Sequence, residues 1–298
     1  MRDLDIIIVS WNVADLLILN LKSIFKFTEN LDYKVIVVDN DSADDTVSLL
    51  KEKFIKEING GKLEILDTKK NNGFSLGNNI GIEKSDSKYI LFMNPDMELS
   101  ENTFYKMFNF MENKSEDVVL STTKLKYEDN SIQHNVKSLP TPLVNIMVLL
   151  KLHHIFYNFK LLKKYFLKGF DYSAESEVEQ IMGAFIFARS NFIKNIGGWN
   201  LDYFLWWEDV DLCRKVFDLK KKIIYTPISE VIHYEGKSFN QLGSVKKQKK
   251  FNKGMKIYSK KYFSKFAYFF IYIFSFVSIF LSFLVKIFKI KPKGQGKI

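Results

Sequence analysis

The sequence predicts an α/β fold with a mixed, mostly parallel central sheet, and two observations support this prediction. Short, continuous apolar runs recur in the first half of the 298-residue chain, for example Lys34–Asp39 (KVIVVD). Strands that are apolar at every position are typical of sheets that helices cover on both faces. Helical stretches separate these runs at short intervals, and this strand–helix alternation is typical of parallel sheets.

The expected strands are followed by polar residues. Four strands are expected in the first half, at Leu4–Ser10, Lys34–Asp39, Leu63–Leu66 and Tyr89–Met93. Later strands are expected near Val118–Ser121, at the edge of the sheet, and at Val178–Arg189, Lys222–Thr226 and Val231–His233. Ligands in open α/β sheets bind beyond the carboxyl ends of strands. The polar residues Asp39, Asn72 and Asp96, which follow strands, are therefore candidates for a ligand site.

The Asn94-Pro95-Asp96 turn after the fourth strand has two interpretations. All three residue types favour turns, and Pro95 cannot continue a central strand, so the segment can be a strand terminator alone. Alternatively, a carboxylate at this place holds a hard divalent cation, which in turn holds a diphosphate. The sequence has no G-x-G-x-x-G or Walker phosphate loop, which argues against a dinucleotide or ATP site of the usual type.

The positive charge is concentrated near the C-terminus. The net charge of the chain is +10, and residues 241–298 hold fourteen lysines and no Asp or Glu, which leaves −4 for residues 1–240. This distribution argues against a nucleic-acid groove across the fold and favours a basic segment beside a membrane. The single cysteine, Cys213, cannot form an intramolecular disulfide and fits a reducing compartment. The N-terminal apolar run Ile6–Val9 is too short for a signal peptide.

A basic amphipathic stretch occupies the middle of the chain. Apolar residues there recur at helical spacing, interleaved with lysines; they are Leu149, Leu152, Phe156, Phe159, Leu162 and Phe166. The pattern fits a helix packed on the sheet, and it equally fits a face that lies on a membrane or contacts a lipid-linked substrate.

A second run that suggests chemistry has the sequence FLWWEDVDLCR. Its three carboxylates, Glu208, Asp209 and Asp211, crowd near the expected start of a helix, where acidic side chains are also favourable electrostatically. Two large aromatic residues, Trp206 and Trp207, precede them. Such rings suit contact with sugars, and they pack equally well in protein cores.

An uncharged apolar segment near the C-terminus, from Phe266 to Val285, is long enough to span a membrane as one helix. Nine lysines occur from Lys246 to Lys265 and five follow the segment, and the excess on the near side predicts that the preceding chain faces the cytoplasm. Because both flanks are basic, a re-entrant or surface-lying helix is the alternative. Three residues, Ser275, Ser278 and Ser282, share one side of the helix, which could instead face protein.

Several short motifs together resemble the family 2 glycosyltransferases, in particular their rhamnosyltransferase-like branch. In chain order these motifs are IVSWN (8–12), VVDNDS (37–42), NGF (72–74), GNN (77–79), MNPD (93–96), GAF (183–185), GGW (197–199), WEDVDL (207–212) and IH (232–233). The resemblance extends from about residue 4 to residue 238 and leaves out the tail and most of residues 140–176. It implies a GT-A fold and an inverting enzyme that moves a sugar from a nucleoside diphosphate to an acceptor hydroxyl.

The resemblance implies donor-binding roles for five of these residues. Asp39 matches a residue that hydrogen-bonds the pyrimidine base, and Ser10 and Asn12 fall in the turn that lines its pocket. Asn72 and Asn79 match positions where the family contacts the ribose and the diphosphate.

The resemblance further implies a metal site, so Mg²⁺ or Mn²⁺ is the expected cofactor. Asp96 matches the metal-binding acid, and His233 matches a histidine that completes the metal site in some relatives, although a structural role for it is an equal alternative. Asn94, a further donor-binding candidate, replaces the first acid of the common Asp-x-Asp motif, so Asp96 should carry the metal contact. Asp209 matches the general base, with Glu208 beside it.

The chemistry agrees with these roles. A departing diphosphate accumulates negative charge, which a divalent cation stabilises. A sugar hydroxyl is a poor nucleophile, and a positioned carboxylate that takes its proton gives roughly 10²–10⁴-fold acceleration. Trp206 and Trp207 are assigned to stacking on a donor or acceptor sugar, with core packing as the alternative.

We therefore expect a membrane-associated glycosyltransferase whose catalytic domain faces the cytoplasm, with a nucleotide-sugar donor and a lipid-linked or nascent polysaccharide acceptor. The expected parts are a glycosyltransferase domain (1–240), divided into a nucleotide-sugar-binding half (1–121) and an acceptor half (122–240), a basic juxtamembrane segment (241–265), a membrane helix (266–288) and a basic tail (289–298). Two other functions compete: a non-catalytic glycan-binding or scaffold member of the family, and a nucleotidyltransferase. The second would need a glycine-rich, basic triphosphate loop, which the sequence lacks.

Overall fold

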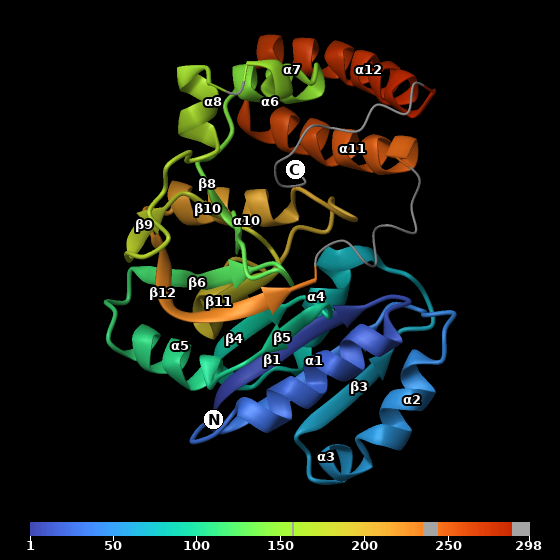
Figure 1. The fold of residues 1–298 in the computed structure, drawn as a ribbon, viewed down its shortest axis with the longest axis vertical. Helices are drawn as coiled ribbons and strands as arrows, with labels where there is room; N and C mark the ends of the chain where they lie inside the picture. The colour runs from blue at the N-terminus through green and yellow to red at the C-terminus, as the bar shows by residue number, and fades with distance from the viewer. Residues whose placement is uncertain (157, 235–243, 288–298) are drawn as a thin grey trace.

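The computed structural model describes residues 1–156, 158–234 and 244–287, and it confirms the predicted α/β fold. A mixed sheet of ten strands has helices on both faces, and a layer of helices covers the end of the molecule opposite α2 and α3 (Figure 1). Along the main path of the sheet the strand order is β3-β2-β1-β4-β11-β6-β12-β5.

The first half of the chain forms the parallel part of the sheet. Its strands are β1 (Arg2–Ser10), β2 (Tyr33–Asp39), β3 (Leu63–Asp67) and β4 (Ser87–Met93), connected by α1 (Ala14–Phe27), α2 (Thr46–Lys53), α3 (Ile55–Asn59) and α4 (Gly73–Lys84). β1 pairs in parallel with β2 and β4, and β2 pairs in parallel with β3. The four strands predicted for this half are confirmed, and their carboxyl ends meet at one edge of the sheet.

The second half makes the sheet mixed. Its strands are β5 (Met97–Leu99), β6 (Val118–Lys126), β7 (Ile132–Gln133), β9 (Ser176–Val178), β11 (Phe185–Arg189) and β12 (Lys222–His233). β11 runs antiparallel to β4 and β6, whereas β12 runs parallel to β6 and antiparallel to β5 and β9. A separate two-stranded sheet joins β8 (Val136–Lys137) to β10 (Gln180–Ile181).

Three details of the predicted second half are wrong. Val118–Ser121 is not an edge strand, because β6 lies between β11 and β12. The single strand expected at Val178–Arg189 is divided among β9, β10 and β11, since each piece pairs with different neighbours, which an apolar pattern cannot reveal. The two strands expected at the C-terminal end of the body are one strand, β12, whose register shifts between Thr226 and Glu230, where Pro227 lacks an N–H.

Two apolar cores lie on the two faces of the sheet. One packs the sheet against α1, α2 and α5 (Thr103–Glu112). The other packs it against α4, α9 (Ser190–Asn195) and α10 (Glu208–Asp218), and it includes the fully buried, free Cys213. α10 therefore stands on the sheet with its N-terminal turn, Glu208 and Asp209, toward the carboxyl ends of the strands.

A third core joins the C-terminal helices to the body. The helices concerned are α6 (Pro142–Leu149), α8 (Lys160–Tyr165), α11 (Ser244–Tyr262) and α12 (Lys265–Ile287). Its buried members are Val144, Val148, Leu149, Tyr165, Tyr203, Trp207, Val210, Met255, Tyr258 and Ile271. The amphipathic middle of the chain forms three short helices, α6, α7 (Leu152–Ile155) and α8. Leu149 and Leu162 are buried, Leu149 in the third core rather than against the sheet, whereas Phe156 and Phe159 are exposed.

α12 confirms the predicted apolar helix. Within the described ranges it is the one helix long and apolar enough to cross a membrane, over Lys265–Leu284 with a mean hydropathy of 2.2. Its serine side, Ser275, Ser278 and Ser282, is buried against protein. The predicted boundary at residue 240 and the basic tail 289–298 lie outside the described residues, and residues 121 and 122 lie inside β6, so the two predicted halves share one sheet.

Candidate active site

The base-binding candidates Ser10, Asn12 and Asp39 lie together beyond β1 and β2. The Asp39 carboxylate is buried and accepts three hydrogen bonds: from the Ser10 hydroxyl at 2.9 Å and from the hydroxyl and N–H of Ser42 at 2.7 and 2.9 Å. Asn12 braces the same turn, because its N–H donates to Ser42 Oγ at 2.9 Å and its Oδ1 accepts from the N–H of Ala43 at 2.6 Å. The carboxylate is therefore held in one orientation before any ligand binds.

Asn72 and Asn79 belong to the start of α4 and differ in what their amides contact. Asn72 donates to the carbonyl oxygen of Lys70 at 3.1 Å and stays partly exposed. Asn79 makes two side-chain hydrogen bonds to the main chain of Trp199. Its Nδ2 donates to the carbonyl oxygen and its Oδ1 accepts from the N–H, each at 2.9 Å. Asn79 thus ties α4 to the turn before Trp199, and these bonds support a structural role for it rather than the predicted donor contact.

The predicted metal ligands Asp96 and His233 face each other at the ends of β4 and β12. Asp96 Oδ1 lies 3.3 Å from His233 Nε2, and both residues are almost completely buried. His233 Nδ1 lies 2.7 Å from Oε1 of Gln133, which can only accept, so Nδ1 donates this hydrogen bond and Nε2 faces Asp96. Asn94 Nδ2 lies 3.4 Å from the same Nε2.

This arrangement fits a divalent cation. Two ligands about 2.1 Å from one octahedral ion, at right angles to each other, lie about 3 Å apart. The separation of 3.3 Å between Asp96 Oδ1 and His233 Nε2 is close to that value. Among the described residues no group of three or more His, Cys, Asp or Glu side chains is placed to hold a metal, so other ligands must come from the donor or from water.

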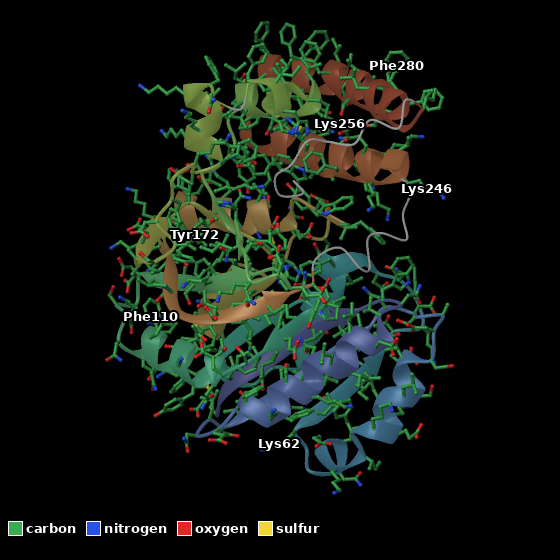
Figure 2. All side chains as sticks on the ribbon, in the orientation of Figure 1. Lys62, Phe110, Tyr172, Lys246, Lys256 and Phe280 are labelled. Carbon is green, nitrogen blue, oxygen red and sulfur yellow. The ribbon has the colours of Figure 1, made fainter. Side chains whose placement is uncertain are left out.

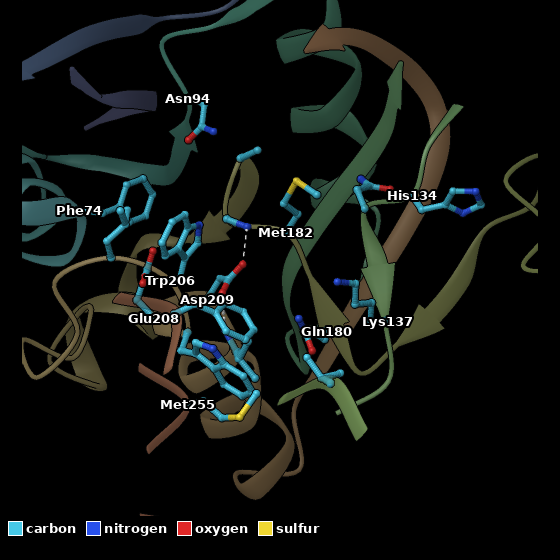
Figure 3. A pocket seen from close by; sticks show the side chains of 18 of the residues that line it. Phe74, Asn94, His134, Lys137, Gln180, Met182, Trp206, Glu208, Asp209 and Met255 are labelled. Atoms are coloured by element: carbon cyan, nitrogen blue, oxygen red, sulfur yellow. Dashed lines mark hydrogen bonds between the residues drawn. The ribbon is translucent and has the colours of Figure 1, made fainter. Parts of the chain in front are cut away.

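One cavity of about 430 Å³ connects Asn94 and His233 with Asp209, the predicted general base (Figure 3). Asn94 and His233 line it from the strand ends, and Glu208 and Asp209 line it from α10. The helices of the third core, which we call the C-terminal layer, form further walls. These walls include Val148 of α6, Tyr165 of α8 and Phe251 and Met255 of α11. The lining does not include Ser10, Asn12, Asp39, Asn72, Asn79 or Asp96, and Asp96 is linked to the cavity through its contact with His233.

Asp209 is held at the start of α10 by two main-chain donors. The N–H of Gly183 donates to Oδ2 at 3.0 Å (dashed line in Figure 3), and the N–H of Val210 donates to Oδ1 at 2.8 Å. Burial raises the pKa of Asp209, and these hydrogen bonds together with the charge of Lys137 oppose that rise. The donors stabilise the ionised carboxylate, the form that a general base requires.

Glu208 has a different environment from its neighbour. It is buried, and its Oε2 has no hydrogen-bond partner within the described part of the chain. Burial and the negative charge of Asp209 raise the pKa of Glu208 well above its ordinary value. Because Asp209 has donors and Glu208 Oε2 has none, Glu208 holds the proton of the pair and Asp209 is the carboxylate.

Trp206 and Trp207 lie in different surroundings. Both have left-handed backbones, with φ of 65° and 76°, which bulky residues adopt only when the surrounding structure holds them. Part of that support is Gly254 of α11, where a Cβ would lie 2.6 Å from the carbonyl oxygen of Trp206. Trp207 is buried against Phe251 and Tyr258 in the third core, which agrees with the alternative that this residue packs in the protein core. Trp206 is half-buried and its ring points into the cavity (Figure 3).

No pattern in the sequence indicated that Gln133, Lys137 and Tyr165 would lie at this site. Gln133 lies on the two-residue strand β7 and Lys137 on the two-residue strand β8, within a segment that has no periodic pattern. Gly183 allows a close approach to α10, because a Cβ there would lie 3.3 Å from the Cβ of Asp209.

The chain was compared with known families and proteins. The sequence model of "Glycosyl transferase family 2" matches residues 5–170, which is more than half of the chain. The rhamnosyltransferase WbbL of Escherichia coli K12 is 26% identical over 227 residues, covering 70% of this chain and 77% of WbbL. The minor teichoic acid biosynthesis protein GgaB of Bacillus subtilis 168 is 30% identical over 140 residues, covering 46% of this chain and 15% of GgaB.

A solved structure supports the fold over nearly the whole chain. The mannosyltransferase PcManGT of Pyrobaculum calidifontis, determined with GDP-mannose and Mn²⁺, superposes with a TM-score of 0.56 at 10% identity, covering 98% of this chain and 78% of PcManGT. The family match, the order of the motifs and the fold lead to one conclusion. The chain belongs to glycosyl transferase family 2, in its rhamnosyltransferase-like branch, and is an inverting glycosyltransferase with a GT-A fold and a nucleotide-sugar donor.

Proposed function

We propose that this enzyme transfers a sugar, by similarity to WbbL a rhamnosyl residue, to a hydroxyl group of a lipid-linked or nascent polysaccharide at the cytoplasmic face of a membrane. The single observation that carries the proposal is the cavity, which joins Asp209 to His233, the partner of Asp96, and has walls from α6, α8 and α11. Helices α6, α8 and α11 belong to the basic, apolar layer at one end of the molecule, and a lipid-linked acceptor requires apolar surface of this kind beside the cavity.

Asp209 is the proposed general base. Its carboxylate lines the cavity, is oriented by the N–H groups of Gly183 and Val210, and takes the proton from the acceptor hydroxyl as the new glycosidic bond forms. A single displacement by the hydroxyl inverts the anomeric centre. Glu208, held neutral beside it, adds no second negative charge next to the base.

Asp39 and the Asp96–His233 pair are the proposed donor contacts. Asp39, with Ser10 and Asn12 around it, binds the base of the nucleotide, and the proposal keeps Asn72 and Asn94, which lines the cavity, as further donor contacts. Asp96 and His233 would hold Mg²⁺ or Mn²⁺, which neutralises charge on the departing diphosphate. Gln133 fixes the ring of His233 so that Nε2 faces Asp96.

Trp206 is the proposed sugar-stacking residue, since its ring points into the cavity (Figure 3). Trp207 supports it from the third core and makes no sugar contact of its own in this proposal.

The test is incubation of the purified full chain with UDP-, dTDP- and GDP-linked sugars, Mg²⁺ or Mn²⁺ and a polyprenyl-diphosphate-linked saccharide. Release of nucleoside diphosphate that depends on the acceptor supports the proposal. Failure to bind any nucleoside diphosphate in calorimetry would overturn it and favour a non-catalytic, glycan-binding role.

A further inference from the structure

The C-terminal layer presents an unusually apolar outer surface. On α12 the exposed side chains include Phe269, Phe276 (55% exposed) and Phe280 (60% exposed), and on the neighbouring segment they include Ile155 (70% exposed) and Phe156. We call these five residues and the helices that carry them the outer face. In Figure 1 α7 and α12 lie at the same extreme end of the molecule, and Figure 2 shows Phe280 projecting outward from it. Contiguous exposed apolar surface of this kind marks an interaction site.

The inner side of α12 is bound to α11 along its length. The buried amide of Asn252 donates to the carbonyl oxygen of Ser275 at 2.8 Å, and Ser282 donates to Oε1 of Gln248 at 3.2 Å. Ile271 at the other end is fully buried in the third core. These pairs show that α12 folds back antiparallel on α11, so the two helices form one hairpin.

This hairpin is incompatible with a membrane-spanning α12. α11 carries eight lysines between Lys246 and Lys261, and a lysine at the centre of a bilayer is strongly unfavourable. If α12 crossed the bilayer with its partner attached, those lysines would enter the hydrocarbon. If it crossed alone, it would leave the buried amide of Asn252 unpaired and open the third core beside Ile271.

The charge around the outer face has one sign. Residues 142–170 and 241–298, which include every helix of the layer, contain nineteen lysines and no Asp or Glu. Since the whole chain has a net charge of +10, the remaining residues carry −9. Lys256 shows how these lysines lie: its Nζ is 5.3 Å from the ring centroid of Tyr272 and 5.9 Å from that of Phe276, beside the apolar side chains of α12. Lysines at the flank of an apolar helix reach lipid phosphates while the rings enter the acyl chains.

We propose that the outer face docks on an anionic lipid bilayer with α12 lying in the plane of the membrane. Phe269, Phe276 and Phe280 enter the boundary between headgroups and acyl chains, α7 adds Ile155 and Phe156, and the lysines of α11 and α8 bind anionic headgroups. The cavity lies directly beneath, because Phe251 and Met255 of α11 form part of its wall. An acceptor anchored in the same membrane would therefore reach Asp209 from the side of this layer.

The first experiment measures binding of the full chain to vesicles of phosphatidylcholine with and without phosphatidylglycerol. Binding should require the anionic lipid and weaken with added salt. Phe276→Ser combined with Phe280→Ser should weaken it at least about tenfold, and Ile155→Ser should weaken it less. The matched control is Ile55→Ser, because Ile55 is also exposed (51%) but lies on α3 at the opposite end of the molecule.

The second experiment measures depth. Cys213 is buried, so a bimane label can be attached to a cysteine introduced at Phe269, Phe276 or Phe280 and quenched by lipids brominated at known depths. An in-plane helix places all three labels at the same shallow depth. A spanning helix places the labels at 269 and 280 roughly 16 Å apart in depth, from the helical rise of about 1.5 Å per residue.

Three outcomes would overturn the proposal. The first is that the three labels lie at graded depths, and the second is that the chain binds neutral and anionic vesicles equally. The third is that the chain does not bind vesicles and instead forms a dimer that Phe276→Ser and Phe280→Ser abolish. That result would assign the outer face to a second copy of the chain. These assays contain no sugar nucleotide, so their failure would leave the proposed transfer reaction standing, and failure of transfer would leave vesicle binding unaffected.

Discussion

The N–H of Gly183 donates a hydrogen bond of 3.0 Å to Oδ2 of Asp209, joining the segment between β10 and β11 to the first turn of α10. A Cβ at position 183 would lie 3.3 Å from the Cβ of Asp209, so the two main chains approach as closely as a glycine allows. The orientation of the proposed base therefore depends on a residue 26 positions away, and it can be disturbed without touching the carboxylate.

Gly183→Ala should displace Asp209 and lower kcat by about tenfold or more, because small misplacements of a reacting group are costly. Affinity for the nucleoside diphosphate should not change, since position 183 lies away from Asp39. Steady-state kinetics and calorimetry measure the two quantities separately. An unaltered kcat in a folded variant would show that this contact does not orient the base.

Glu208→Gln should flatten the pH dependence of stability. The folded pKa of Glu208 is raised above the unfolded value of 4.5, so the folded protein holds a proton that the unfolded chain releases. The stabilisation is complete below the unfolded pKa and is lost as the pH rises toward the folded pKa. The Tm of the wild type should thus fall more between about pH 5 and pH 8 than the Tm of the variant. Glu116→Gln, at an exposed site, is the control, and identical Tm profiles for Glu208→Gln and wild type would contradict a buried, protonated Glu208.

Gln133→Leu should raise the Mn²⁺ concentration needed for half-maximal activity by roughly 10–100-fold, as expected when the residue that orients a metal-binding histidine is lost. The variant should reach normal activity at saturating metal. The control is Ile132→Leu, because Ile132 is adjacent in the sequence and exposed. If the metal titration of Gln133→Leu matched that of the wild type, His233 would not be a ligand. Chelation with EDTA should abolish transfer in every variant.

Ser42→Ala should weaken nucleoside diphosphate binding by up to about tenfold, because the Asp39 carboxylate loses a hydroxyl donor and Asn12 loses its acceptor. Calorimetry with UDP, dTDP and GDP measures the change. Ser173→Ala, at an exposed turn where the hydroxyl donates to Asp171 Oδ1 at 2.6 Å, should bind normally. Equal affinities of the two variants for the nucleoside diphosphate would show that the nucleotide base binds elsewhere.

The predictable parts of this molecule are those with a local signal. The parallel strands could be predicted because their apolar runs are continuous, and the polar residues at their ends, such as Asp39 and Asp96, could be recognised because parallel strands end at one edge of a sheet. Glu208 and Asp209 could be proposed as catalytic residues because their motif resembles that of the family, and the structure places both at the start of α10. Which of the two is the base follows from tertiary contacts, since only Asp209 meets the N–H of Gly183.

The parts that were missed depend on contacts between distant segments. Nothing near Gln133 in the sequence indicates that it will meet a histidine 100 positions later. The long apolar helix α12 could be predicted from composition, but its pairing with lysine-rich α11 could not, because that depends on the contact between Asn252 and Ser275. Trp207 looked like Trp206 in the sequence, and only the third core separates them.

The most direct test of the account is the rate of sugar transfer by Asp209→Asn. Asparagine keeps the size of the side chain and removes the base, so kcat should fall by roughly 10²–10⁴-fold while nucleoside diphosphate binding survives. Asp218→Asn, at the exposed end of the same helix, should transfer normally. Normal turnover by Asp209→Asn would contradict the assignment of the base and, with it, the proposed mechanism.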